Sequence, residues 1–169
     1  GALRYGAEIY ADIHPPPLHW LHFEKTFSYV RGQFNQPVEG IRNIPFIPAA
    51  RLITQLKGEF LKKGKKIGNL SITAELDNTF RQNKAFTAYN TETPTKGYTL
   101  LNAFIGADFL HHKKTLFSVY VAGNNLTDIA YQSHLSRLKY TDVNEVTGRE
   151  GVFNMGRNFS IKINVPLSF

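Results

Sequence analysis

The chain has 169 residues, enough for one domain with an ordinary core, and its formal net charge is +7. It has no cysteine, which excludes disulfides and thiolate chemistry, and no run of about 18 apolar residues, which excludes a transmembrane helix. Apart from the cluster at 62–66, whose central Gly64 indicates a solvated turn, the basic residues are scattered. Nucleic acid is therefore not an expected partner.

Apolar and polar residues alternate in seven segments, and this period of two predicts seven β-strands. The predicted strands, in chain order, are 3–13, 20–29, 51–61, 68–80, 98–110, 115–122 and 157–169. The last one is the clearest, because its odd positions are all apolar from Phe159 to the terminal Phe169. The expected fold class is all-β, with antiparallel strands that are apolar on one side and polar on the other.

Short and long connections alternate along the chain. The short ones are 15–17, 62–66 and 111–114, and the long, irregular ones are 32–50, 81–96 and 123–156. All short turns therefore fall at one end of the sheet and all long loops at the other. Eleven residues at ~3.3 Å each, tilted by about 45°, span roughly 25 Å. Both features are typical of outer-membrane β-barrels, which have short periplasmic turns and long extracellular loops.

Two observations predict that the chain is part of a longer protein. Seven is an odd number of strands, whereas bacterial single-chain barrels have an even number, and an open sheet edge is not stable in lipid. The N-terminus has no signal peptide and begins directly with the alternating residues Gly1 to Tyr5.

Several segments together resemble the C-terminal part of the TonB-dependent outer-membrane receptors, and the resemblance covers nearly the whole chain. They are Ile13-His-Pro-Pro-Pro-Leu-His-Trp-Leu-His-Phe-Glu24, Ile44-Pro-Phe-Ile-Pro-Ala-Ala-Arg51, Pro94-Thr-Lys-Gly-Tyr-Thr-Leu-Leu-Asn102, Val121-Ala-Gly-Asn-Asn-Leu-Thr-Asp-Ile-Ala-Tyr131, Met155-Gly-Arg-Asn-Phe159 and the terminal Phe169. The order and spacing of these segments carry the resemblance, and no single one does.

The resemblance implies a segment of about seven strands, residues 1–169, from a 22-stranded barrel in the bacterial outer membrane. The plug, the TonB box that couples transport to TonB, and the other barrel strands would belong to the parent chain. Implied partners are outer-membrane lipid, the barrel-assembly machinery, which would read Phe169 as its signal, and a transported ferric siderophore, haem or similar metal chelate. No cofactor is implied.

No catalytic or metal-binding constellation is predicted. His14, His19 and His22 lie near one turn and His111 with His112 at another; we interpret them as polar turn residues, without acidic partners at ligand spacing. The carboxylates Glu75 and Asp77 share the polar side of one strand but lack a placed partner. The chain is therefore not expected to be an enzyme.

Ligand binding is expected in the long loops, which carry aromatic and basic residues suited to an anionic, ring-bearing ligand. The candidates are Phe86, Tyr89, Tyr131, His134, Arg137, Tyr140 and Arg149. Packing of the loops alone would also explain each of them. Arg51, Lys57, Arg81 and Lys162 are expected on the polar side, where they would line a transport path or pair with the plug.

The alternative hypothesis is a self-contained soluble β-sandwich or small barrel that acts as a binding module. Its apolar faces would meet each other in a core, and it would fold without detergent. A small outer-membrane barrel enzyme is the third possibility, but no Ser, His and acid converge on one side of the strands.

Overall fold

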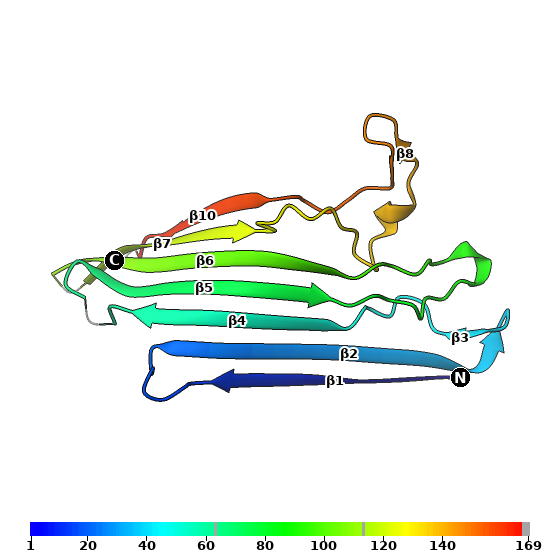
Figure 1. Cartoon of the computed structure of the whole chain (residues 1–169), viewed down its shortest axis with the longest axis horizontal. Coiled ribbons are helices and arrows are strands. Elements are labelled where there is room, and N and C mark those ends of the chain that lie inside the picture. Colours follow the sequence, from blue (N-terminus) through cyan, green and yellow to red (C-terminus); the bar gives the residue numbers. More distant parts are fainter. Residues whose placement is uncertain (63, 113, 167–169) are drawn as a thin grey trace.

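The computed structural model of the chain describes residues 1–62, 64–112 and 114–166. It is an antiparallel sheet in the order β1-β2-β4-β5-β6-β7-β10, with the short β3 paired to β2 (Figure 1). The strands are β1 (Ala2–Ile13), β2 (Leu21–Val38), β3 (Ile41–Asn43), β4 (Arg51–Phe60), β5 (Ile67–Thr79), β6 (Tyr98–His111), β7 (Lys114–Asn124) and β10 (Asn158–Asn164). The loops hold the 3-10 turns η1 (Ala88–Asn90) and η2 (Arg137–Tyr140) and the small pair β8 (Val143–Asn144) and β9 (Arg149–Glu150). Within the described ranges, no helix is long and apolar enough to cross a membrane.

The predicted all-β, antiparallel sheet of about seven strands is confirmed, with most boundaries within two residues of their predicted positions. The last strand ends earlier than predicted, at Asn164, and residues 167–169 lie outside the described part of the chain. The main error concerns 32–50, predicted to be irregular. Strand β2 continues to Val38 and returns as β3.

The β2 extension was missed because Gln33, Asn35 and Gln36, the polar residues after Gly32, fall on both faces of the strand and hide the period of two. Its strand conformation comes from pairing with β1, which reaches the pair Ala2 and Phe34. Between β2 and β3, Glu39 and Gly40 both have positive φ angles, 48° and 76°. Two consecutive left-handed residues are the pattern of a tight hairpin turn.

One face of the sheet is apolar and uncovered. The register aligns Ile72 of β5, Ile105 of β6, Val121 of β7 and Ile161 of β10 in one row across four strands. These side chains belong to residues that are 45%, 49%, 37% and 70% exposed. In the described residues this face therefore packs on no second layer of protein, unlike the face of a soluble sandwich.

The opposite face is polar, and its side chains bond to one another across the strands. Arg51 donates two hydrogen bonds to the Asp77 carboxylate, at 2.7 and 2.6 Å. Glu75 accepts hydrogen bonds from Gln55 and, at 2.7 Å, from Asn102. The carboxylates Glu75 and Asp77, which the sequence left without partners, are thus both hydrogen-bonded within the sheet.

Burial of apolar side chains is concentrated outside the sheet. The buried hydrophobic residues of the described chain are Ile47, Ala85, Phe86, Ala88 and Leu100. Only Leu100 belongs to a strand, because the other four lie in the connections β3–β4 and β5–β6. The loops, and not the strands, hold the interior of this chain.

Candidate ligand-binding site in the loops

The long connections gather at one end of the sheet, where Figure 1 shows β3, the green turn of η1 and the orange β8 hairpin together. We call the residues 39–50, 80–97 and 125–157 the loop cap. The short connections β1–β2, β4–β5 and β6–β7 lie at the other end. The predicted separation of short turns from long loops is therefore confirmed.

Glu92 joins the first two loops. It is 3% exposed, and its carboxylate accepts hydrogen bonds from the backbone N–H of Phe46 at 2.9 Å and of Phe86 at 3.0 Å. A buried carboxylate is stable only when its oxygens are paired in this way. The predicted candidate Phe86 also packs edge-on against Phe34, with ring centroids 5.9 Å apart. Phe86 is thus part of the interior of the loop cap.

His134 and Lys139 bring the third loop onto Glu92. The Nδ1 atom of His134 lies 2.9 Å from the Thr95 hydroxyl, and its Nε2 atom lies 3.7 Å from a Glu92 carboxylate oxygen. Lys139 donates to the same Thr95 hydroxyl at 2.8 Å and to the Thr93 carbonyl at 3.4 Å. His134 and Lys139 are 5% and 7% exposed. Three loops distant in sequence are therefore joined by buried polar groups.

Burial lowers the pKa of His134, and the nearby positive charge of Lys139 lowers it further, while Glu92 acts in the opposite direction. The imidazole is consequently neutral at neutral pH. A neutral ring with one nitrogen on a hydroxyl is a structural group, and it holds the loops together.

A cavity of about 810 Å³ lies between the second and third loops. Its lining includes the aromatic rings of Tyr98, Tyr131, Tyr140 and Phe153, together with Lys139. Tyr131 packs against Tyr98 with the rings tilted by 39° and their centroids 4.4 Å apart, and burial raises the pKa of Tyr131. Volumes of this size and aromatic linings with a few polar groups are typical of small-molecule sites.

The seven predicted site residues separate into three groups. Phe86 and His134 are buried in the interior of the loop cap, and Tyr131 and Tyr140 line the cavity. The third group is exposed: Tyr89 is 72% exposed, hydrogen-bonds to Glu39 and does not line the cavity. The remaining two, Arg137 and Arg149, are exposed, and each lies over an aromatic ring, Phe46 at 5.0 Å and Phe153 at 5.2 Å.

Sequence reasoning missed Glu92, Lys139, Tyr98 and Asn125. Asn125 is 2% exposed; its amide accepts from the Ile129 N–H at 2.9 Å and donates to the Ile129 carbonyl at 2.9 Å. It lies in the Asn-Asn-Leu-Thr-Asp stretch that carried part of the family resemblance. That motif was a usable signal for the start of the third loop. Glu92 and Lys139 have no such signal, because their partners are far away in the sequence.

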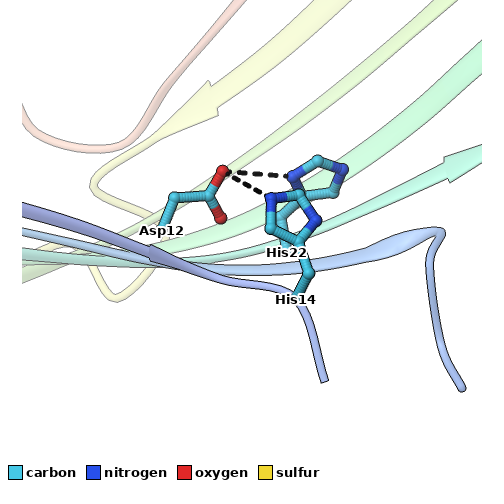
Figure 2. Close-up of side chains that lie close together, drawn as sticks. All are labelled: Asp12, His14 and His22. Atoms are coloured by element: carbon cyan, nitrogen blue, oxygen red, sulfur yellow. Dashed lines mark hydrogen bonds and ion pairs between the residues drawn. The ribbon is translucent and has the colours of Figure 1, made fainter. Parts of the chain in front are cut away.

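The expectation that the turn histidines have no acidic partner was wrong for His14 and His22. Asp12, His14 and His22 form a cluster in which one Asp12 carboxylate oxygen is close to both histidines (Figure 2). Asp12 was missed because it belongs to β1, whereas His22 belongs to β2, and only strand pairing brings them together. His111 and His112, at another turn, contact each other edge-on with ring centroids 4.1 Å apart.

The combination of an open antiparallel sheet, one uncovered apolar face and long loops at one end defines a segment of a larger β-barrel. The chain matches part of the solved structure titled "Copper transporter OprC", with a TM-score of 0.76 and 17% sequence identity. The match covers 97% of this chain and 24% of that one, so the chain spans about a quarter of its length. No family model matches the sequence, and no curated protein matches it either.

The sheet thus has the fold of one section of a TonB-dependent receptor barrel, as the sequence resemblance predicted. The matched protein is titled a transporter.

Proposed function

We propose that residues 1–169 form the C-terminal barrel segment of a TonB-dependent active transporter in the bacterial outer membrane, and that its cargo is a ferric siderophore, haem or a similar metal chelate. The observation that carries this proposal is the exposed apolar row Ile72, Ile105, Val121 and Ile161. Such a face is stable in contact with the hydrocarbon of a membrane. The opposite, hydrogen-bonded polar face would then line the interior of the barrel.

The edges of the sheet indicate the other partners. β1 and β10 are the end strands of the sheet. In a closed barrel each would pair with a strand outside this chain, because an unpaired edge is unstable in lipid. The plug would lie against the polar face, TonB would act through the parent chain, and Phe169, outside the described residues, would be read by the barrel-assembly machinery.

The loop cavity supports a ring-bearing anionic cargo. Tyr98, Tyr131 and Tyr140 offer aromatic faces, and Lys139 supplies a positive charge beside them. A metal chelate combines flat or ring-bearing groups with negative charge. The matched transporter is titled as one for copper, so a metal cargo agrees with that name as well.

The membrane part of the proposal is tested by cysteine labelling, because this chain has no cysteine of its own. Ile105→Cys and Ile72→Cys lie on the apolar face, whereas their neighbours Phe104→Cys and Thr73→Cys lie on the polar face. In membranes, a lipid-dissolved maleimide should react with the first pair and a charged aqueous maleimide with the second. A protein that stays in the soluble fraction, with Ile105→Cys protected from both reagents, would instead support the soluble binding module.

The ligand part is tested on the full-length protein that carries this chain, with a ferric catecholate chelate and haem as probes. Tyr131→Ala and Tyr140→Ala should weaken binding of the cognate probe at least tenfold. The matched control is Tyr89→Ala, since Tyr89 is exposed and does not line the cavity. Equal binding by all three variants would show that the cavity is not the binding site. The outcome of the labelling experiment would not be affected.

A further inference from the structure

We propose that Asp12, His14 and His22 form a binding site for a divalent transition-metal ion of the zinc or copper class. Figure 2 shows the two imidazole rings beside one carboxylate oxygen of Asp12. That Oδ2 atom lies 3.0 Å from Nε2 of His14 and 3.5 Å from Nδ1 of His22. One ligand atom from each residue lies within 4.8 Å of the other two.

These separations are those of atoms that share a metal. With metal–ligand bonds of about 2.0–2.1 Å, neighbouring ligands of a tetrahedral ion are roughly 3.3 Å apart. The two Asp12 contacts, 3.0 and 3.5 Å, lie on either side of this spacing. The ligand atoms of the two histidines lie within 4.8 Å of each other, so a cation fits between the three residues once the exposed His14 ring adjusts.

The backbone holds the cluster together at the end of the first hairpin. In the register of β1 and β2, Asp12 is opposite Glu24 and Ile13 is opposite Phe23. The side chains of Asp12 and His22 consequently project from the same, polar face. Because two strands fix two of the ligands, the site is largely formed before an ion arrives.

Glu59 supplies the outer contact that a metal-bound histidine usually has. The Nε2 atom of His22 is buried and makes no hydrogen bond within the described residues, but it lies 3.7 Å from a Glu59 carboxylate oxygen. When Nδ1 binds a metal, the proton of the neutral ring is on Nε2, 3.7 Å from this oxygen, and a small ring movement would bring the two into hydrogen-bond distance. Histidine ligands typically donate their other N–H to a carboxylate in this way.

The donor set selects the class of ion. Two imidazoles and one carboxylate suit zinc, copper or nickel, whereas magnesium and calcium prefer sites made of oxygen. Water would complete the coordination on the solvent side, where the His14 side chain is 46% exposed. The cluster lies at the short-turn end of the sheet, away from the loop cap, and is a different site from the cargo cavity.

The test uses the full-length protein that carries this chain, stripped of metal with a chelator and titrated with Zn²⁺ and Cu²⁺ by calorimetry. His14→Gln and Asp12→Asn should each remove one bound equivalent or weaken it at least tenfold. His14 is the best position because its exposed side chain can be changed without disturbing the fold. His19→Gln is the matched control: this histidine is in the same turn but outside the cluster.

Spectroscopy gives a readout that does not depend on transport. Electron paramagnetic resonance of the Cu²⁺-loaded protein should show two coordinated nitrogens in the wild type and His19→Gln, and one in His14→Gln. Mg²⁺ should not compete. The proposal is overturned if His14→Gln and Asp12→Asn bind Zn²⁺ and Cu²⁺ as the wild type does, or if His19→Gln loses the same equivalent.

Discussion

The sheet and the loop cap distribute their side chains in opposite ways. In the sheet, large apolar residues such as Ile105 and Ile161 are exposed, and the polar face is bonded to itself. In the loop cap, the charged residues Glu92 and Lys139 are buried beside apolar ones. The two regions therefore differ in what covers their apolar side chains. In the described residues the apolar face of the sheet has no protein cover, whereas the loop cap has its own interior.

The largest loss of loop-cap stability is expected from a substitution at Glu92. In Glu92→Ala, the part-buried N–H of Phe46 and the buried N–H of Phe86 lose their acceptor, which should cost up to about 6 kcal/mol of loop-cap stability, at ~1–3 kcal/mol for each donor. Hydrogen exchange and limited proteolysis of the membrane-embedded protein measure this, with the exposed Glu145→Ala as control. The sheet amides should stay protected, and their simultaneous loss would show that the two regions are not independent.

The sheet should respond to charge on one face only. Ile105→Lys places an ammonium group on the apolar face and should destabilise the membrane-embedded protein by about 2–4 kcal/mol. Thr73→Lys is the matched control, because Thr73 is opposite Phe104, the next residue in β6, and lies on the polar face. Urea unfolding from lipid vesicles compares the two. Equal destabilisation would contradict a lipid-facing row.

A substitution at Asn125, where β7 passes into the third loop, tests the boundary between the sheet and the loop cap. Asn125→Ala removes the acceptor of the Ile129 N–H and should destabilise the loop cap by about 1–3 kcal/mol. Asn83→Ala, at an exposed position in the second loop, is expected to be neutral. Hydrogen exchange at Ile129 reports the effect directly. Unchanged protection in Asn125→Ala would assign the turn to backbone contacts alone.

The smallest expected effect is a pH dependence confined to the loop cap. The folded-state pKa of His134 lies below the usual value of about 6.5, so at lower pH the unfolded loops bind a proton that the folded loops resist. Loop-cap stability should therefore fall as pH drops through and below about 6.5. The charges facing His134 are Lys139 and Glu92. His134→Gln should flatten this dependence, and an unchanged profile would point to another titrating group.

The sheet could largely be predicted from the sequence because apolar and polar residues alternate along its strands. From Phe159 to Ile163, for example, every second residue is apolar, so a short window of sequence is enough to predict the strand. The contacts of the loop cap could not be predicted from the sequence, because Glu92 accepts from the N–H of Phe46, and His134 contacts the Thr95 hydroxyl, 39 residues away. Those contacts depend on how the loops fold back over the sheet.

The same reason explains the errors within the sheet. The end of β2 has polar residues and was predicted as a loop, although pairing with β1 as far as Phe34 and with β3 at Val38 extends the strand. Asp12 and His22 are 10 positions apart and were judged separately, although neighbouring strands bring them within 3.5 Å. Backbone pairing thus created both the long strand and the acid–histidine cluster.

The turn at Glu39 and Gly40 is also a suitable position for an inserted epitope. Strand β2 is 18 residues long, and at ~3.3 Å per residue with a tilt of about 45° it spans roughly 42 Å, well beyond an apolar band of about 25 Å. A Cβ atom at Gly40 would have no neighbour within 4 Å. A short epitope inserted between these residues would stand clear of lipid head groups, and antibody staining of intact cells would then reveal which compartment the loop cap faces.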